Sequence, residues 1–132
     1  MPYPYNTRYY PTMPAIEVAL GTPEADFSLG PLPTIIDTGA DITMMPREYL
    51  IRLGAQVVAS GYLRSPWGER HNVKIYQVNI RIEGHNLYDV EVASNPRGRE
   101  ILLGRDVLNQ LNLQLDGLNE VVVVLEVSGQ RE

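Results

Sequence analysis

Residues 34–43 read TIIDTGADIT, a stretch in which a short apolar segment runs directly into an aspartate. The three residues before Asp37 are β-branched, which is typical of a strand. Gly39 allows the backbone to turn sharply after this strand, and Thr38 offers a hydroxyl group that can tie the turn by hydrogen bonding. A carboxylate at a strand end projects from a rigid base, so Asp37 is a candidate catalytic group.

A second segment, residues 101–108, reads ILLGRDVL and passes from an apolar stretch through a glycine. The pattern predicts a strand over residues 101–103 and a helix over residues 105–111. Together, the DTGAD and ILLGRD segments resemble the signature of the single-domain, retrovirus-like aspartic proteases, the retropepsins. In that family a DTG or DSG loop carries the catalytic aspartate, and the second segment threads beside it. The resemblance covers about residues 15–127.

The resemblance implies an all-β fold, namely a closed or partly open barrel of the acid-protease type with one or two short helices, assembled as a homodimer. It also implies that Asp37, Thr38 and Gly39 form the catalytic loop of an aspartic endopeptidase. Such an enzyme hydrolyses peptide bonds in extended polypeptides by activating a water between two aspartates. Because the chain carries one such loop, a second copy is expected to supply the partner of Asp37.

The resemblance assigns roles to residues around this loop. Ala40 and Leu102 are expected to line the central substrate pocket, with plain core packing as the alternative. Asp41 is expected to contact the substrate backbone and to form a structural ion pair with Arg105. Two separate surface charges are the alternative reading of that pair.

The turn at residues 65–68, Ser-Pro-Trp-Gly, separates two expected strands. By the resemblance it is the flap, a hairpin that closes over the substrate in relatives. Trp67 and Gly68 are then substrate-binding residues, with an exposed turn aromatic as the alternative reading of Trp67. Retroviral flap tips are rich in glycine, so Pro66 and Trp67 predict a stiffer and bulkier tip here.

Apolar alternation and turn residues predict a series of short strands and two short helices. The expected strands cover residues 15–20, 33–36, 42–45, 56–62, 73–82, 87–93, 101–103, 113–115 and 121–127, and the expected helices cover residues 46–53 and 105–111. The run Val121 to Leu125 is a hazard if exposed at a sheet edge. It is predicted to be a buried strand or, as the preferred reading, to pair with a second subunit as chain ends do in relatives.

Two regions of different composition divide the chain. Residues 1–14 hold four prolines and four tyrosines, which predicts an extended and loosely ordered arm, or an arm laid on a partner subunit. Residues 15–132 are expected to form the single protease domain.

The composition of the 132 residues argues against several function classes. The formal net charge is −5, so no nucleic-acid partner is expected. The absence of cysteine excludes disulfides and thiolate catalysis. His71 and His85 show no metal-ligand spacing, and neither a metal nor a cofactor is expected. Without an apolar run long enough for a membrane span or a signal peptide, no membrane partner is expected and the cytoplasm is the default compartment.

Two other readings stay open on the sequence. The chain could be a non-catalytic dimerisation or peptide-binding module that keeps the retropepsin-like fold. It could also be the protease domain of a larger polyprotein or multidomain chain.

Overall fold

The computed structural model describes residues 2–64, 67–95 and 98–126. These residues form ten strands and two short helices. In chain order they are β1 (Pro2–Pro4), β2 (Ala15–Thr22), β3 (Ala25–Ile36), β4 (Met44–Pro46), α1 (Arg47–Leu53), β5 (Gln56–Arg64), β6 (Arg70–Ile82), β7 (His85–Asn95), β8 (Ile101–Leu103), α2 (Arg105–Leu108), β9 (Asn112–Asp116) and β10 (Val121–Leu125). Residues 65–66 of the predicted flap turn and residue 127 of the predicted last strand lie outside the described residues.

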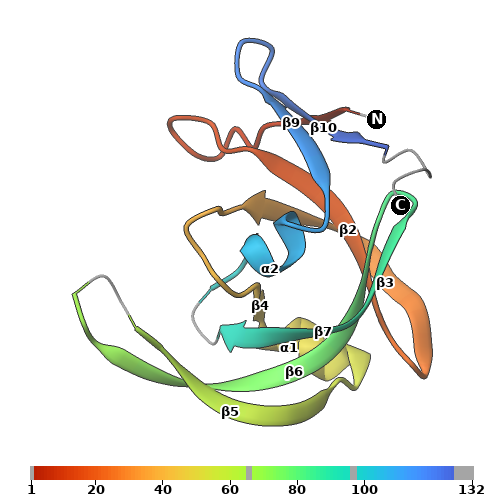
Figure 1. The fold of residues 1–132 in the computed structure, drawn as a ribbon, viewed down its shortest axis with the longest axis vertical. Helices are drawn as coiled ribbons and strands as arrows, with labels where there is room; N and C mark the ends of the chain where they lie inside the picture. The colour runs from red at the N-terminus through yellow and green to blue at the C-terminus, as the bar shows by residue number, and fades with distance from the viewer. Residues whose placement is uncertain (1, 65–66, 96–97, 127–132) are drawn as a thin grey trace.

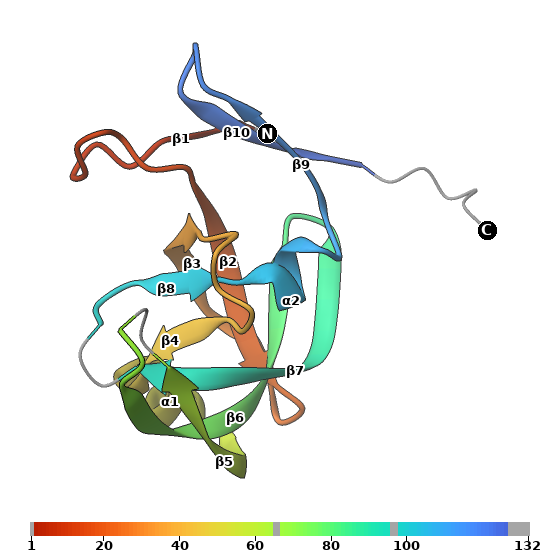
Figure 2. The same cartoon turned by 60° about the vertical axis from the view of Figure 1, so that its left-hand side comes forward.

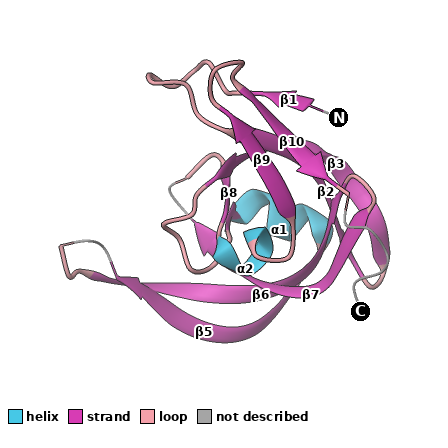
Figure 3. Ribbon diagram, turned by 45° about the horizontal axis from the view of Figure 1, so that its top comes forward, coloured by secondary structure: helices cyan, strands magenta, loops and turns pink. Residues whose placement is uncertain are grey.

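Six strands close into a barrel in the order β2-β3-β8-β4-β7-β6. The ring closes because β2 pairs with β3 along one edge and with β6 along the other. β5 pairs with the first half of β6, and these two strands extend outward as a long hairpin (Figures 1 and 3). Closure protects the backbone groups that an open sheet would leave at its edges. The predicted mostly-β barrel with two short helices is therefore confirmed.

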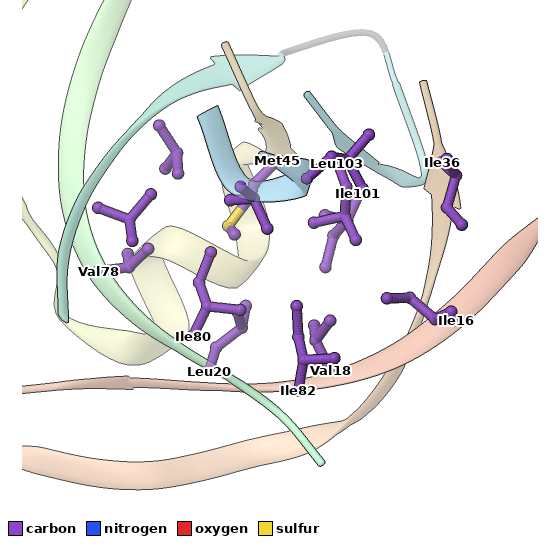
Figure 4. Close-up of a cluster of buried hydrophobic side chains, with 14 of the residues drawn as sticks. Ile16, Val18, Leu20, Ile36, Met45, Val78, Ile80, Ile82, Ile101 and Leu103 are labelled. Atoms are coloured by element: carbon purple, nitrogen blue, oxygen red, sulfur yellow. The ribbon is translucent and has the colours of Figure 1, made fainter. Parts of the chain in front are cut away.

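Apolar side chains fill the interior of the barrel, as Figure 4 shows. Val78, Ile80 and Ile82 have no exposed surface, and they alternate along β6 as the sequence predicts. The same alternation buries three residues of β2: Ile16, Val18 and Leu20. Burial of each such side chain contributes about 1.5–3 kcal/mol, so this core fixes the strands that carry the candidate catalytic loop.

Both predicted helices are present. α1 begins directly after Pro46, whose fixed φ suits a helix start, and ends at Gly54, which adopts a left-handed φ of 69°. α2 is shorter than the predicted span 105–111. Its end tightens to three-residue spacing, with the Gln110 N–H donating to the Val107 carbonyl (2.9 Å). Neither helix in the described part of the chain is long and apolar enough to cross a membrane.

β3 is longer than the sequence predicts, because it begins at Ala25 rather than at residue 33. Gly30, Pro31 and Pro33 fall within it, and both residue types are signals against a regular strand. The pairing between β2 and β3 shifts register twice along this stretch. Bulges accommodate glycine and proline within a strand, and these residues are the reason that the sequence does not predict the first part of β3.

A second sheet, in the order β1-β10-β9, lies at one end of the molecule, and the β5–β6 hairpin lies toward the other (Figure 2). The prediction of a loose N-terminal arm is therefore wrong for β1, which pairs with β10 of the same chain. Burial raises the pKa of Tyr3 to about 12, and the charge and hydrogen bonding of Glu83 add to the effect. The composition of the arm is misleading because its pairing partner lies at the far end of the chain.

β10 is the middle strand of this terminal sheet, and it carries the valine-rich run. Val122 and Val124 are buried, with 0% and 4% of their surface exposed. β9 pairs with all five residues of β10 along one edge, and β1 pairs with Val121, Val122 and Val123 along the other. The run therefore pairs with strands of its own chain, and the preferred reading that it pairs with a second subunit stays a prediction.

Candidate active site

The strand that delivers Asp37, β3, lies between β2 and β8. β8 lies between β3 and β4, parallel to β3 and antiparallel to β4. Leu102 of β8 is thereby opposite both Ile35 and Met44. At the end of this ladder the Asp37 N–H donates to the carbonyl of Leu103 (3.0 Å). The aspartate thus leaves β3 from a backbone that is fixed on both sides.

The turn after Asp37 is closed by short hydrogen bonds to that residue. The Gly39 N–H donates to Asp37 Oδ1 (3.1 Å), and the Ala40 N–H donates to the Asp37 carbonyl (3.1 Å). Asp37 itself is half-buried. This N–H fixes one carboxylate oxygen and leaves Oδ2 for other partners. This arrangement suits a carboxylate that must face a substrate in a fixed orientation.

Gly104 lets the second motif pass directly against the candidate catalytic loop. A Cβ atom at this position would lie 2.8 Å from the carbonyl carbon of Ile42 and 3.0 Å from the carbonyl oxygen of Ala40. Those neighbours are backbone atoms, which cannot move aside as a side chain could. The next residue stabilises this contact, since the Arg105 N–H donates to the Ala40 carbonyl (2.8 Å).

A side-chain network joins the two motifs beneath the loop. Thr43 is fully buried, and its Oγ1 donates to Asp106 Oδ1 (2.7 Å) while accepting from the Gly104 N–H (3.0 Å). Asp106 Oδ2 accepts from the Thr43 N–H (3.1 Å), and Oδ1 also accepts from the Val107 N–H (2.9 Å). Sequence reasoning missed both roles. The available signal was a threonine and an aspartate inside otherwise apolar motifs, where buried polar groups need partners.

The predicted ion pair between Asp41 and Arg105 is not formed in this subunit. Arg105 Nη1 instead donates to the carbonyl of Thr38 (2.7 Å), and the two described side chains do not come within salt-bridge distance of each other. Both are exposed. An exposed ion pair contributes only about 0–1 kcal/mol, so a nearby backbone carbonyl competes successfully for the guanidinium group. Arg105 therefore holds the candidate catalytic loop through the backbone of Thr38.

A cleft of about 640 Å³ opens in front of the loop. Four predicted site residues line it: Asp37, Gly39, Ala40 and Asp41. The cleft is completed by residues that sequence reasoning did not select: Ile42, Met44, Tyr62, Leu63 and Arg64. The last three are the final residues of β5, so one wall of the cleft is the part of the hairpin next to its turn. Leu102, Trp67 and Gly68 are not among the lining residues, and Leu102 is half-buried in β8.

The tip of the β5–β6 hairpin is exposed. Trp67 retains 85% of its accessible surface, and Gly68 adopts a left-handed φ of 91°. Nearer the barrel, the Arg70 guanidinium carbon lies 3.8 Å from the centre of the Tyr62 ring. Such cation–π stacking restrains a side chain that would otherwise be mobile. The roles of Trp67 and Gly68 in substrate binding stay predictions.

The donor set of the site is oxygen-based and contains two aspartates, Asp37 and Asp41. Within the part of the chain that the structure describes, no three His, Asp or Glu side chains gather as they would around a metal ion. His71 is exposed and lies 3.6 Å from Glu69 through its Nε2. Carboxylates placed at a cleft in this way can act as acid or base toward a water.

The family model described as "gag-polyprotein putative aspartyl protease" matches residues 26–110. The chain belongs to this family. The matched span runs from β3 through the end of α2, so it contains the DTG loop, the β5–β6 hairpin and the Gly104 segment. No curated protein sequence matches the chain.

Solved structures share the retropepsin-like fold of this family member. A retropepsin-like aspartic protease from Rickettsia conorii superposes with a TM-score of 0.64 at 14% identity, covering 97% of this chain and 92% of that chain. EIAV protease, complexed with the inhibitor HBY-793, gives 0.55 at 21% identity, covering 82% and 93%. The retroviral protease-like domain of Ddi1 from Leishmania major gives 0.56 at 14% identity, covering 87% and 90%. At these identities the likeness concerns the fold.

Proposed function

We propose that this chain is an aspartic endopeptidase that works as a homodimer, with one catalytic Asp37 from each subunit. The observation that carries the proposal is the single DTG loop, whose Asp37 is held by backbone bonds and faces a cleft of about 640 Å³. Aspartic protease chemistry needs two carboxylates. A two-fold axis between two copies of the loop supplies the second one.

In the proposed mechanism the two Asp37 carboxyl groups lie about 3 Å apart and share one proton, because two like charges at that distance cannot both ionise readily. The ionised member takes a proton from a water, whose oxygen attacks the scissile carbonyl carbon. The protonated member donates a hydrogen bond to the carbonyl oxygen. The tetrahedral intermediate then collapses as the amide nitrogen takes a proton and the C–N bond breaks, releasing an acid and an amine.

The loop is suited to this role because its orientation does not depend on substrate. The Gly39 N–H restrains one oxygen of Asp37, and Arg105 restrains the Thr38 carbonyl. Pre-set groups of this kind need little reorganisation during reaction. In the dimer, Thr38 is proposed to tie the two loops together across the axis.

The substrate is proposed to bind as an extended strand between the loop and the β5–β6 hairpin. Gly39 and Asp41 line the floor of the cleft, where their backbone groups can pair with a peptide backbone. Ala40, Ile42 and Met44 give the floor an apolar character, which suits apolar residues beside the cut. The hairpin, with Trp67 and Gly68 at its tip, is proposed to close over the peptide and exclude water.

The test is the Asp37→Asn variant. The variant should lose cleavage of denatured protein substrates across about pH 3–7 while keeping the dimeric mass of the wild type, because the substitution is nearly isosteric. Asp26→Asn, an exposed aspartate outside the cleft, is the matched control and should keep activity. Wild-type protein that dimerises and binds peptides but cuts none of them would instead identify a non-catalytic binding module.

A further inference from the structure

The catalytic cleft continues into a groove along the hairpin, from its turn end toward the barrel. A cavity of about 410 Å³ shares Met44 and Leu63 with the catalytic cleft. A further cavity of about 500 Å³ shares Asn72, Val73 and Ser94 with that one. We call these two adjoining cavities the hairpin groove. A peptide that lies across Asp37 therefore has room for side chains in this direction.

The hairpin groove is lined by basic residues. Arg70 and His71 line its first cavity, and Arg47 and Lys74 line its second. No Asp or Glu is among the described residues that line either cavity. Because Glu69 lies 3.6 Å from His71, the excess positive charge comes from the two arginines and the lysine, and it contrasts with the net charge of −5 for the whole chain. Such a concave basic surface attracts acidic groups.

Two arginines face each other where the groove meets the catalytic cleft. Arg64 of β5 is directly opposite Arg70 of β6 in the antiparallel register. Like charges in directly opposite positions destabilise a strand pair. Stacking on Tyr62 holds Arg70 in place, but a ring carries no compensating charge. The two arginines thus form a concentrated positive charge beside the cleft, which an incoming carboxylate would neutralise.

We propose that Arg64 and Arg70 determine substrate specificity by binding an acidic side chain close to the scissile bond. The proposal rests on the proposed protease function and deepens it. Arg64 lines the same cleft as Asp37, so the acidic residue is expected within a few positions of the cut. A guanidinium group binds a carboxylate through paired hydrogen bonds, and the incoming charge relieves the repulsion between the two arginines. The preferred substrate is therefore an extended peptide with apolar residues at the cut and an Asp or Glu nearby.

The test compares matched peptides that carry Glu or Gln at one position at a time around a common cleavage site. Assays at about pH 6 keep the substrate Glu ionised, since its ordinary pKa is about 4.3. We expect kcat/KM for the Glu peptide to exceed that for the Gln peptide by about fivefold at one position or more. Arg64→Gln and Arg70→Gln should each reduce this ratio, and added salt should do the same.

Arg81→Gln is the matched control, because Arg81 also stacks on a ring (Phe27, 4.1 Å) but lies outside the groove. The control should keep the wild-type ratio. Equal cleavage of Glu and Gln peptides by the wild type overturns the specificity proposal while leaving the protease function intact. A ratio that survives in the Arg64→Gln, Arg70→Gln double variant also overturns it. Absence of cleavage of every peptide overturns both proposals.

Discussion

The floor and the hairpin wall of the cleft are built in opposite ways. The floor is the loop at residues 37–43 pressed against residues 104–106, and its backbone and buried side chains are bonded to one another. The hairpin is a two-stranded extension whose tip residue Trp67 is 85% exposed. In the proposed function, the floor holds the Asp37 carboxylate in one orientation, whereas the wall admits, covers and releases a peptide.

This difference between the floor and the hairpin predicts where the protein tolerates substitutions. A substitution in the floor contacts backbone atoms and disturbs buried hydrogen bonds. It is therefore expected to lower both the free energy of unfolding and kcat. A substitution in the hairpin meets solvent or substrate, so its cost appears in substrate affinity and choice. The damage caused by substitution should therefore decrease from the floor to the hairpin, and further to the terminal sheet.

Gly104→Ala is expected to damage the floor most. The new Cβ would lie within 3.0 Å of backbone atoms of Ile42 and Ala40, and overpacking of this kind costs about 2–3 kcal/mol. Gly117→Ala is the control, since a Cβ atom at that position would have no neighbour within 4 Å and the φ of Gly117 is not left-handed. Urea unfolding measures the free energy of unfolding of both variants. Equal losses of stability in the two variants would show that the floor is not tightly packed.

Thr43→Val is expected to lower the free energy of unfolding by about 1–3 kcal/mol and to lower kcat, because the Gly104 N–H and Asp106 lose their shared hydroxyl. Thr43→Ser should restore both. The control is Thr34→Val, which breaks the buried bond from Thr34 to the Ile16 carbonyl (2.9 Å) away from the loop. A fall in kcat of the same size in the control would deny the floor network a positioning role.

Trp67→Ala is expected to weaken substrate binding by the hairpin without changing the stability of the protein. Because the side chain is largely exposed, the free energy of unfolding should change by no more than about 0.5 kcal/mol. KM for peptide substrates should rise by about threefold or more, since the hairpin loses contact area over the substrate. Steady-state kinetics and urea unfolding on one preparation measure the two quantities. An unchanged KM would remove Trp67 from the substrate site.

Asp116→Asn is expected to affect neither the floor nor the hairpin, because Asp116 lies at the end of β9 in the terminal sheet. Hydrogen bonds from Asn119 hold the pKa of Asp116 below its ordinary value. A carboxyl group with a lowered pKa in the folded state stabilises the protein above about pH 3.9 and loses this contribution as pH falls through the folded-state pKa. The variant should thus be less stable than the wild type at neutral pH, with the difference closing in acid. A difference that is the same at every pH would contradict this.

Sequence reasoning succeeds where structure is determined locally. The strand leading to Asp37, the helix end at Gly54 and the alternation of Val78, Ile80 and Ile82 each follow from neighbouring residues. Because the two motifs are strong local patterns, they predict Asp37, Gly39, Ala40 and Asp41 at one site, and these residues do line one cleft.

Sequence reasoning fails where the structure depends on residues that are distant along the chain. The composition of β1 predicts a loose arm because its partner, β10, lies at the other end of the chain. The bond between Thr43 and Asp106 spans 63 positions, so no local pattern reveals it. The partner of Arg105 is mispredicted for a related reason. Whether a guanidinium group meets the Asp41 carboxylate or the Thr38 carbonyl depends on distances that spacing along the sequence does not set.

The proposed pairing of two copies of Asp37 at one two-fold axis can be tested by the mass of the protein in solution. Analytical ultracentrifugation over a concentration series, with and without a transition-state-mimicking aspartic protease inhibitor, measures it. We expect twice the chain mass at high concentration, and a shift toward that mass when the inhibitor is added, because the ligand binds only the paired form. A particle that keeps the mass of one chain at every concentration, with inhibitor present, would contradict the shared active site.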